Sequence, residues 1–130
     1  MELNLLSDVT SQALAAALRG TAARQTVIAD NVANVDTPGF TRNDVEFETA
    51  LATALDETRR APFSSADRIS ALSFGKSRDY ASPARADGNN VDIDREMAAL
   101  ARNTLGSRAA SEMLGTRVRM LRAVINASRQ

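Results

Sequence analysis

Two long stretches, one near each end of the chain, carry apolar or small residues alternately four and three positions apart. In the first stretch these positions are Leu14, Leu18, Thr21, Gln25, Ile28, Val32 and Val35. In the second they are Ile93, Met97, Leu100, Thr104, Ser107, Ser111, Leu114, Val118, Leu121 and Ile125. This spacing is typical of a coiled-coil seam and predicts two helices, about 40 and 50 Å long. Neither helix could bury its stripe alone.

The segment between these helices lacks a sustained repeat, so the chain divides into residues 1–35, 36–90 and 91–130, together one domain. Acidic residues alternate with apolar ones over residues 44–48, which favours a short strand. The residues that follow favour a turn or two of helix. The Ser-, Ala- and Arg-rich stretch after them is typical of a loop, with a short hairpin expected at residues 69–74. The sequence predicts a mainly α fold with an irregular or short-β middle segment.

Composition removes most enzymatic functions. The 130 residues include no Cys and no His, which excludes disulfides, thiol chemistry, zinc sites built on sulfur or imidazole, and histidine acid–base catalysis. The formal net charge is zero and the pI is about 6.3, and aromatic residues are scarce, so neither a basic surface nor stacking platforms for nucleic acid are expected. We predict no catalytic residue, no cofactor, no metal and no small-molecule substrate.

Two acidic stretches resemble catalytic sites and fail in detail. The Asp-Thr at residues 36–37 is of the kind that aspartic proteases use in pairs, but the chain has a single such loop and a proline follows it. The alternating acids of residues 44–48 could suggest a glycosidase pair. Alternating acids on a strand more often form a solvated face or pair with arginines, which is the interpretation we favour.

The stretch DGNNVDIDRE, residues 87–96, resembles a calcium loop. It lacks the glycine at the sixth position and the glutamate at the twelfth that an EF-hand needs. A helix start explains these residues better. Asp92 suits the N-cap position, and Asp94 and Glu96 place negative charge in the first turn, where the helix dipole favours it.

The C-terminal helix ends in a basic stretch. Its arginines are Arg117, Arg119, Arg122 and Arg129. Residues 30–57, by contrast, carry seven acidic residues and one arginine. Three interpretations remain open: half of a contact between subunits with complementary charge, a solvated helix end that suits the dipole, and, least favoured, a nucleic-acid contact.

The amino terminus, MELNLLSDVT, lacks the basic n-region and the apolar length of a signal peptide. The chain also has no run of about 20 apolar residues that would span a membrane. Taken alone, these features predict a soluble cytoplasmic protein. They leave open an export route that uses no cleaved signal.

The stretch NVANVDTPGFTR, residues 31–42, predicts an abrupt helix end. Thr37 precedes a proline and is therefore disfavoured in the helical region. Pro38 and Gly39 suit the two central positions of a type II turn, because proline fixes φ and glycine accepts a positive φ. Asn34 can satisfy carbonyls left open at the helix end, and Phe40 supplies an apolar anchor beyond the turn.

The same stretch resembles the signature of the bacterial flagellar rod and hook family, in which an N-terminal helix ends in Asn-x-x-Asn-x-x-Thr-Pro-Gly-aromatic. The matching residues are Asn31, Asn34, Thr37, Pro38, Gly39 and Phe40. Residues 89–126 are similar to the C-terminal helix of that family. Because 130 residues leave no room for large inserted domains, the chain most resembles the short proximal rod subunits of the B type, with the C type as the nearest competitor.

This resemblance implies a structural subunit that is not an enzyme. Its terminal helices would pair as an antiparallel coiled coil, and the motif would fix the exit of the chain from the inner helix. The subunit would be exported by the flagellar type III system without a cleaved signal and would assemble in the periplasmic rod into a helical tube that transmits torque and encloses part of the export channel. Its partners would be copies of itself, other rod proteins, an adaptor protein and the membrane ring or export gate.

The seam residues expected to carry this packing are ten in number. They are Leu14, Leu18, Ile28, Val32, Met97, Leu100, Leu114, Val118, Leu121 and Ile125. A soluble helical adaptor or export chaperone would share the two-helix pattern but would not need the Thr-Pro-Gly exit. A cell-wall hydrolase is the enzymatic alternative.

Overall fold

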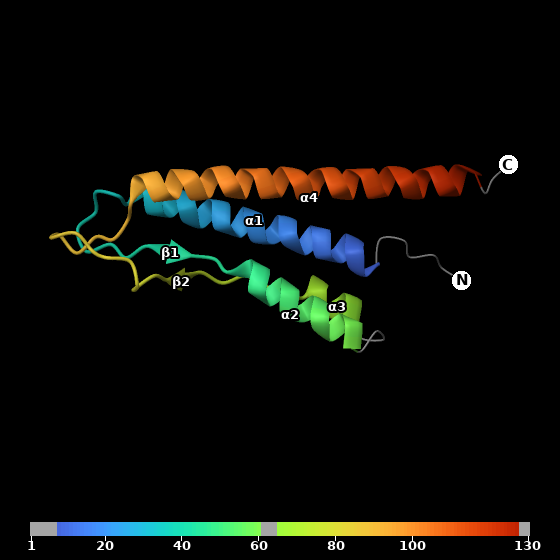
Figure 1. Cartoon of the computed structure of the whole chain (residues 1–130), viewed down its shortest axis with the longest axis horizontal. Helices are drawn as coiled ribbons and strands as arrows, with labels where there is room; N and C mark the ends of the chain where they lie inside the picture. Colours follow the sequence, from blue (N-terminus) through green and yellow to red (C-terminus); the bar gives the residue numbers. More distant parts are fainter. Residues whose placement is uncertain (1–7, 61–64, 128–130) are drawn as a thin grey trace.

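The computed structural model describes residues 8–60 and 65–127. In chain order the elements are α1 (Val9–Ala33), β1 (Asn43–Asp44), α2 (Phe47–Arg60), α3 (Ser65–Ser70), β2 (Ser77–Arg78) and α4 (Ile93–Ala127). α1 lies in the middle, with antiparallel α4 along one side and α2 and α3 along the other (Figure 1). This arrangement confirms the predicted mainly α fold with paired terminal helices and a short antiparallel sheet between them.

The middle segment is more helical than its sequence pattern suggested. β1 has only two residues, which pair with β2, and the chain turns into the 14-residue helix α2 at Phe47. The expected hairpin at residues 69–74 is wrong, because Ile69 belongs to α3. The reason is tertiary: Ile69 is fully buried beside Ala16 of α1 and Ala54 of α2, and a helical turn presents it to both.

The apolar core lies between α1 and the middle segment. One cluster joins Ala16, Ala54 and Ile69, and a second joins Val27, Val45 and Phe47, with partly buried Phe74 packed against it. Neither cluster includes a residue of α4. The helix pair is therefore not the main apolar core of the described chain, although its 4-3 pattern suggested that it would be.

Phe47 anchors α2 to α1. An ideal Cβ built on Gly20 would lie 2.3 Å from Cγ of Phe47, so only a glycine lets the ring approach the helix this closely. The Phe47 ring also meets the ring of Phe74 edge-on, with centroids 5.7 Å apart, and the Arg24 guanidinium lies 4.6 Å from its centroid. These contacts hold the start of α2 against α1.

Polar side chains link α1 to α4 at three levels. Asn31 donates to Glu96 at 3.1 Å, and Asn103 of α4 donates to the Thr21 carbonyl oxygen of α1 at 2.8 Å. At the far end Arg117 of α4 bonds to the first turn of α1. Glu96 and Asn103 are buried, seven residues apart in α4, as is Ala110 a further seven along.

The buried positions of α4 differ by one residue from three positions of the predicted seam. The positions buried against α1 are 96, 103 and 110, whereas the prediction placed 97, 104 and 111 there. Met97 is 43% exposed and Ile125 is 42% exposed. At the first of these positions the cause is tertiary, because Glu96 pairs with a buried arginine of the middle segment, described below.

Of the other eight predicted seam residues, one is buried and seven are partly exposed. Ile28 is buried at 3% exposure. The remaining seven are partly exposed: Leu14, Leu18, Val32, Leu100, Leu114, Val118 and Leu121.

No helix within residues 8–60 and 65–127 is both long and apolar enough to cross a membrane.

Candidate functional site

α1 ends in two hydrogen-bonded turns within residues 31–40, the stretch that resembles the rod and hook signature. The Asn34 side chain donates from Nδ2 to the Asp30 carbonyl oxygen at 2.8 Å, which satisfies one carbonyl left open at the helix end. The next turn is closed by the Phe40 amide, which donates to the Thr37 carbonyl oxygen at 3.2 Å. Gly39 stands at the third position of this turn with a φ of 71°. These features confirm the helix end and the turn predicted from the Pro-Gly pair.

A buried asparagine from the other end of the middle segment holds this turn. Asn89 is fully buried, and its Nδ2 donates to the carbonyl oxygens of Asn34, Val35 and Thr37 at 2.9, 3.2 and 2.8 Å. Its Oδ1 accepts the amide of Val91 at 2.7 Å. The Asn89 side chain therefore bonds both to the backbone that follows α1 and to the backbone that precedes α4. It fixes the two helix ends to one another. We call the turn at residues 34–40 and the loop at residues 85–91 the corner.

Two glycines let the backbones of the corner meet. The Gly39 amide donates to the Asp87 carbonyl oxygen at 2.8 Å. Gly88 has a φ of 80°, and a Cβ built on it would lie 3.4 Å from the Cα of Gly39. A side chain at Gly88 would therefore strain the backbone, and its Cβ would touch the turn.

We expect Gly39→Val to lower the free energy of unfolding by about 1–2 kcal/mol, because a β-branched residue is disfavoured at a φ of 71°. No atom lies within 4 Å of a Cβ at this position, so the loss reports backbone strain and not a clash. Gly39→Asn is the matched control, since asparagine tolerates positive φ. Thermal unfolding of both variants measures the difference, and equal melting temperatures would refute the strained turn.

A buried ion-pair cluster lies directly after the corner. Nε of Arg42 contacts Oε1 of Glu96 at 2.5 Å, Nη1 contacts Asp79 at 2.9 Å, and Nη2 contacts Asp44 at 3.0 Å. The second oxygen of Glu96 accepts from Asn31 at 3.1 Å. The side chains of Arg42 and Glu96 are 5% and 0% exposed. We call these five residues the Arg42 cluster; it joins α1, β1, the segment after β2 and α4.

The surroundings of Arg42 and Asp79 favour the charged forms of these two side chains. Burial acts to lower the pKa of Arg42, but the hydrogen bond and charge of Glu96, with those of Asp44, raise it overall. The Ser82 hydroxyl, aided by backbone amides and Arg42, lowers the pKa of Asp79 to about 2 against the opposing effect of burial. Because its pKa is depressed in the folded chain, Asp79 contributes stability above about pH 4 that is lost as the pH falls toward 2.

The structure separates the six predicted motif residues into two groups. Asn31 is fully buried and exchanges two hydrogen bonds with the backbone of Asn43, at 2.8 and 2.9 Å. It therefore ties the last turn of α1 to β1 and, through Glu96, to α4. Thr37, Pro38 and Gly39 are exposed, while Asn34 and Phe40 are partly buried.

Sequence reasoning missed four residues that hold this site together. Arg42, Asn89 and Asn90 received no role, and Glu96 was assigned only a charge in the first turn of a helix. Asn90 is 8% exposed, accepts the Arg42 amide at 2.6 Å and donates to the Asp79 carbonyl oxygen at 2.6 Å. The available signal was the pair of adjacent asparagines just before a helix, since such residues bond to loop backbones. Asp92 does act as an N-cap, accepting the amides of residues 94 and 95.

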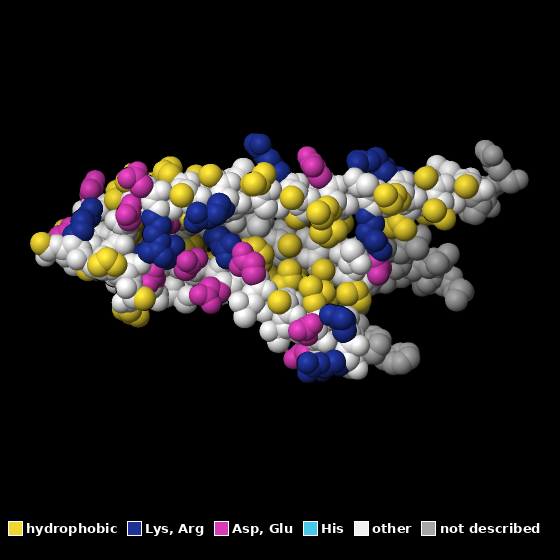
Figure 2. Space-filling model, in the orientation of Figure 1, with side chains coloured by type: hydrophobic (Ala, Val, Ile, Leu, Met, Phe, Trp, Pro, Cys, Tyr) yellow, Lys and Arg dark blue, Asp and Glu magenta, His cyan; other side chains and the backbone are white. Residues whose placement is uncertain are grey.

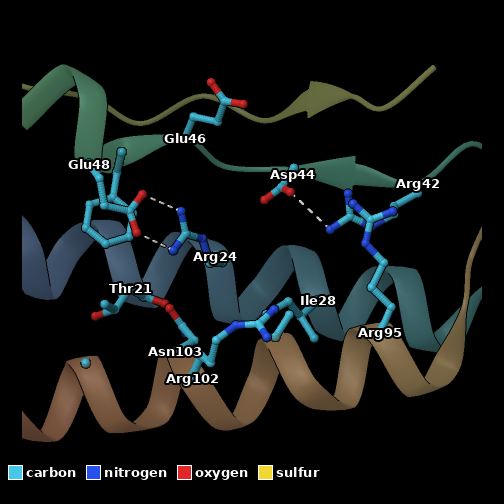
Figure 3. A pocket seen from close by; sticks show the side chains of 13 residues that line it. Thr21, Arg24, Ile28, Arg42, Asp44, Glu46, Glu48, Arg95, Arg102 and Asn103 are labelled. Carbon is cyan, nitrogen blue, oxygen red and sulfur yellow. Dashed lines mark hydrogen bonds and ion pairs between the residues drawn. The ribbon is translucent and has the colours of Figure 1, made fainter. Parts of the chain in front are cut away.

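A cavity of about 380 Å³ opens beside the Arg42 cluster, between α1, α4 and the chain from residue 42 to residue 48 (Figure 3). Its charged groups pair mostly with one another. Arg24 makes a two-pronged ion pair with Glu48 at 2.5 Å, which raises the pKa of Arg24 and lowers that of Glu48. Arg42 is held by Asp44. These groups brace the walls of the cavity.

These side chains make contacts that hold the fold together. The Arg42 guanidinium is bound by three carboxylates, and the buried amides hold backbone. Within residues 8–60 and 65–127 no group of His, Cys, Asp or Glu is arranged to hold a metal ion. Fold and site together define a helical structural protein in which the corner and the Arg42 cluster hold two long helices to a smaller helical layer.

Comparison with known proteins gives this subunit its family. Residues 12–41 match the sequence model described as "Flagella basal body rod protein". The flagellar basal body rod protein FlgB of Borrelia hermsii is 43% identical over 94 residues, covering 63% of this chain and 70% of the relative. FlgB of Bacillus subtilis is 31% identical over 123 residues, covering 89% and 92%. FlgB of Salmonella typhimurium is 29% identical over 120 residues, covering 84% and 87%.

The chain belongs to the family of flagellar basal body rod proteins. This confirms the resemblance to the flagellar rod proteins that the motif at residues 31–40 carried, and the relatives named are of the B type that the length of the chain favoured. Like its relatives, the protein is a structural component of the basal body rod and is not an enzyme. The cell-wall hydrolase alternative is thereby set aside.

Proposed function

We propose that the chain is a proximal rod subunit that packs with copies of itself and with other rod proteins into a helical tube. The tube transmits torque and encloses part of the export channel. The chief support is the surface of α4, which carries large apolar side chains exposed to solvent. They include Ile93, Met97, Leu105, Met113, Met120 and Val124, at 43 to 71% exposure. Exposed apolar side chains in such number on one helix favour burial against partner helices.

The arrangement in two layers supports different roles for the terminal helices and for the middle segment. In this proposal residues 1–35 and 91–130 form the inner helical layer, and residues 36–90 form the outer one. α2 and α3 pack on the side of α1 away from α4 (Figure 1). The corner then sets the direction in which the chain leaves the inner helix. The seam residues that remain partly exposed, such as Leu100 and Leu121, are proposed to gain contacts from neighbouring helices on assembly.

The proposal also covers how the subunit is exported and where it assembles. The subunit is exported by the flagellar type III system without a cleaved signal and assembles in the periplasm at the base of the rod. There it meets an adaptor protein and the membrane ring or export gate. The support is family membership together with a small apolar core, which lets the chain pass unfolded through a narrow channel at low cost.

Leu105→Glu tests the assembly surface. Leu105 is 71% exposed in the subunit, so the change should alter the free energy of unfolding by no more than about 0.5 kcal/mol. If α4 packs against neighbouring helices, a buried carboxylate at this position prevents rod assembly, and swimming in soft agar is lost. Ala52→Glu, at an exposed position of α2, is the matched control and should swim. Normal motility of the Leu105 variant, with the protein present in basal bodies, would refute this surface.

A further inference from the structure

Gly106 is a glycine that the packing of the single subunit does not require. It lies in the interior of α4, where glycine is less favourable than alanine. A Cβ built on Gly106 would meet no atom within 4 Å, whereas one built on Gly20 would clash with Phe47. Gly106 lines the cavity beside the Arg42 cluster, on the same side of α4 as Ala99 and Arg102. The missing side chain therefore leaves the α4 wall of this cavity open.

The same wall carries a buried acceptor that lacks a donor. Asn103 is 4% exposed and lines the cavity, and Figure 3 shows its side chain rising from α4 toward Thr21. Its Nδ2 donates to the Thr21 carbonyl oxygen at 2.8 Å and to Oε1 of Gln25 at 3.3 Å, which fixes the orientation of the amide. Its Oδ1 is buried and has no hydrogen-bond partner within residues 8–60 and 65–127. Because a buried acceptor without a donor is unfavourable, the cavity favours an occupant that donates a hydrogen bond.

The interior of the cavity suits a neutral occupant better than an ion. Figure 2 shows basic and acidic side chains side by side on this face, between α4 and β1. Arg24 already pairs with Glu48, and Arg42 with Asp44, so an ion inside would compete with these pairs. The volume is about 380 Å³, whereas a cavity of about 150 Å³ holds a benzene molecule. An aromatic ring that carries a hydroxyl group therefore fits the cavity in size and in hydrogen bonding.

Tyr80 is the side chain of this protein with that chemistry. It is the single tyrosine of the chain and is 76% exposed, two residues after the end of β2. Its side chain makes no hydrogen bond or ring contact with the rest of the described chain. The preceding residue, Asp79, is bound by Arg42 and by the Ser82 hydroxyl. The backbone beside Tyr80 is thus held in place while its ring faces solvent, as suits a side chain that contacts a partner.

We propose that Tyr80 of a second copy enters the cavity, packs its ring beside Gly106 and donates from its hydroxyl to Oδ1 of Asn103. This inference rests on the proposed function, since it needs copies of the chain next to one another in the rod. Charge complementarity supports it. Arg78 lies two residues before Tyr80 and Glu46 lines the cavity, and both are exposed and make no ion pair within the described ranges. Because the inserted side chain and the cavity are different surfaces, the contact is head to tail and repeats from copy to copy.

Photocross-linking from position 80 tests this contact. Tyr80→p-benzoylphenylalanine keeps an aromatic side chain and, on illumination, bonds to C–H groups that lie near it. In purified basal bodies we expect a covalent dimer of this chain, with the second peptide drawn from the cavity walls at residues 21–28 or 95–106. The same label at Ala52, an exposed position of α2, is the matched control and should give no product with these peptides.

A second variant closes the cavity without weakening the fold. Gly106→Leu places a side chain where no atom lies within 4 Å of the Cβ, and leucine is the better helix former. The melting temperature should therefore not fall, yet the dimer formed from position 80 should be lost. Ala52→Leu, outside the cavity, should leave the dimer in place. A dimer that persists in the Gly106 variant would overturn the proposal.

The identity of the cross-linked product separates the remaining cases. Products confined to one chain, or formed with a different rod protein, would show that a second copy does not fill the cavity. If the parent chain is present in basal bodies and the label gives no dimer, this contact is rejected and the proposed function stands. If the parent chain is absent from basal bodies, the proposed function is rejected and this contact with it.

Discussion

Replacing Arg42 with methionine should lower the free energy of unfolding by about 3–5 kcal/mol, which is the cost of leaving a buried carboxylate without its partner. Glu96 is fully buried, and Arg42 is its nearest cation at 2.5 Å. Methionine keeps the aliphatic length of the side chain and removes the charge, so the loss reports electrostatics and not a cavity. In thermal unfolding followed by circular dichroism, a loss of this size should lower the melting temperature by about 10–20 °C.

Two further variants separate the ion pair from other effects. In Arg42→Met/Glu96→Leu the unpaired carboxylate is gone, and most of the lost stability should return. Arg59→Met removes an exposed arginine whose ion pair with Asp56 spans 3.8 Å, and it should change stability by less than about 1 kcal/mol. If Arg42→Met unfolds at the temperature of the parent chain, the Arg42 cluster does not hold the middle segment to the helix pair.

Gly20→Ala should destabilise the chain by about 1–3 kcal/mol, although alanine is the better helix former by about 1 kcal/mol. The reason is contact with Phe47, whose Cγ and Cδ2 would lie 2.3 and 2.4 Å from the new Cβ. Either the ring leaves its place beside Phe74 and Arg24, or α2 shifts from α1. Denaturant unfolding of the two chains measures the loss directly.

Gly106 provides the matched control within the same protein. A Cβ at Gly106 meets no atom within 4 Å, so Gly106→Ala should stabilise α4 by about 1 kcal/mol. Opposite signs for the same substitution in two helices isolate the contact with Phe47 from helix propensity. Phe47→Leu in the Gly20→Ala background should then cost less than it does alone, because the shorter side chain relieves the clash. A stabilising Gly20→Ala would show that α2 is not seated against this glycine.

The elements that depend on local chemistry were predictable from the sequence. The end of α1, the turn at Pro38-Gly39 and the N-cap at Asp92 each follow from the conformational limits of a few adjacent residues, and the structure has all three. The two long helices follow from a repeat that persists over many turns. The motif at residues 31–40 was also sufficient to indicate the family, and it lies within residues 12–41, the stretch that matches the family model.

The details that depend on distant partners were not predictable. Three positions of the 4-3 stripe of α4 were placed one residue too far along the chain, and the sequence offered no reason to place Glu96 inside and Met97 outside. That choice is made by Arg42, which lies 54 positions away in the chain. The role of Asn89 is likewise decided by three carbonyls more than 50 residues before it.

By itself, then, the sequence determined that this protein has two long helices, an abrupt exit from the first of them and no means of catalysis by cysteine or histidine. These are properties of single residues and of short-range repeats. Only the tertiary structure decided that the apolar core lies between α1 and the middle segment, and that α1 and α4 are joined by polar contacts. Burial of a charge or an amide depends on a partner brought close by folding, and a pattern along the chain carries no record of that partner.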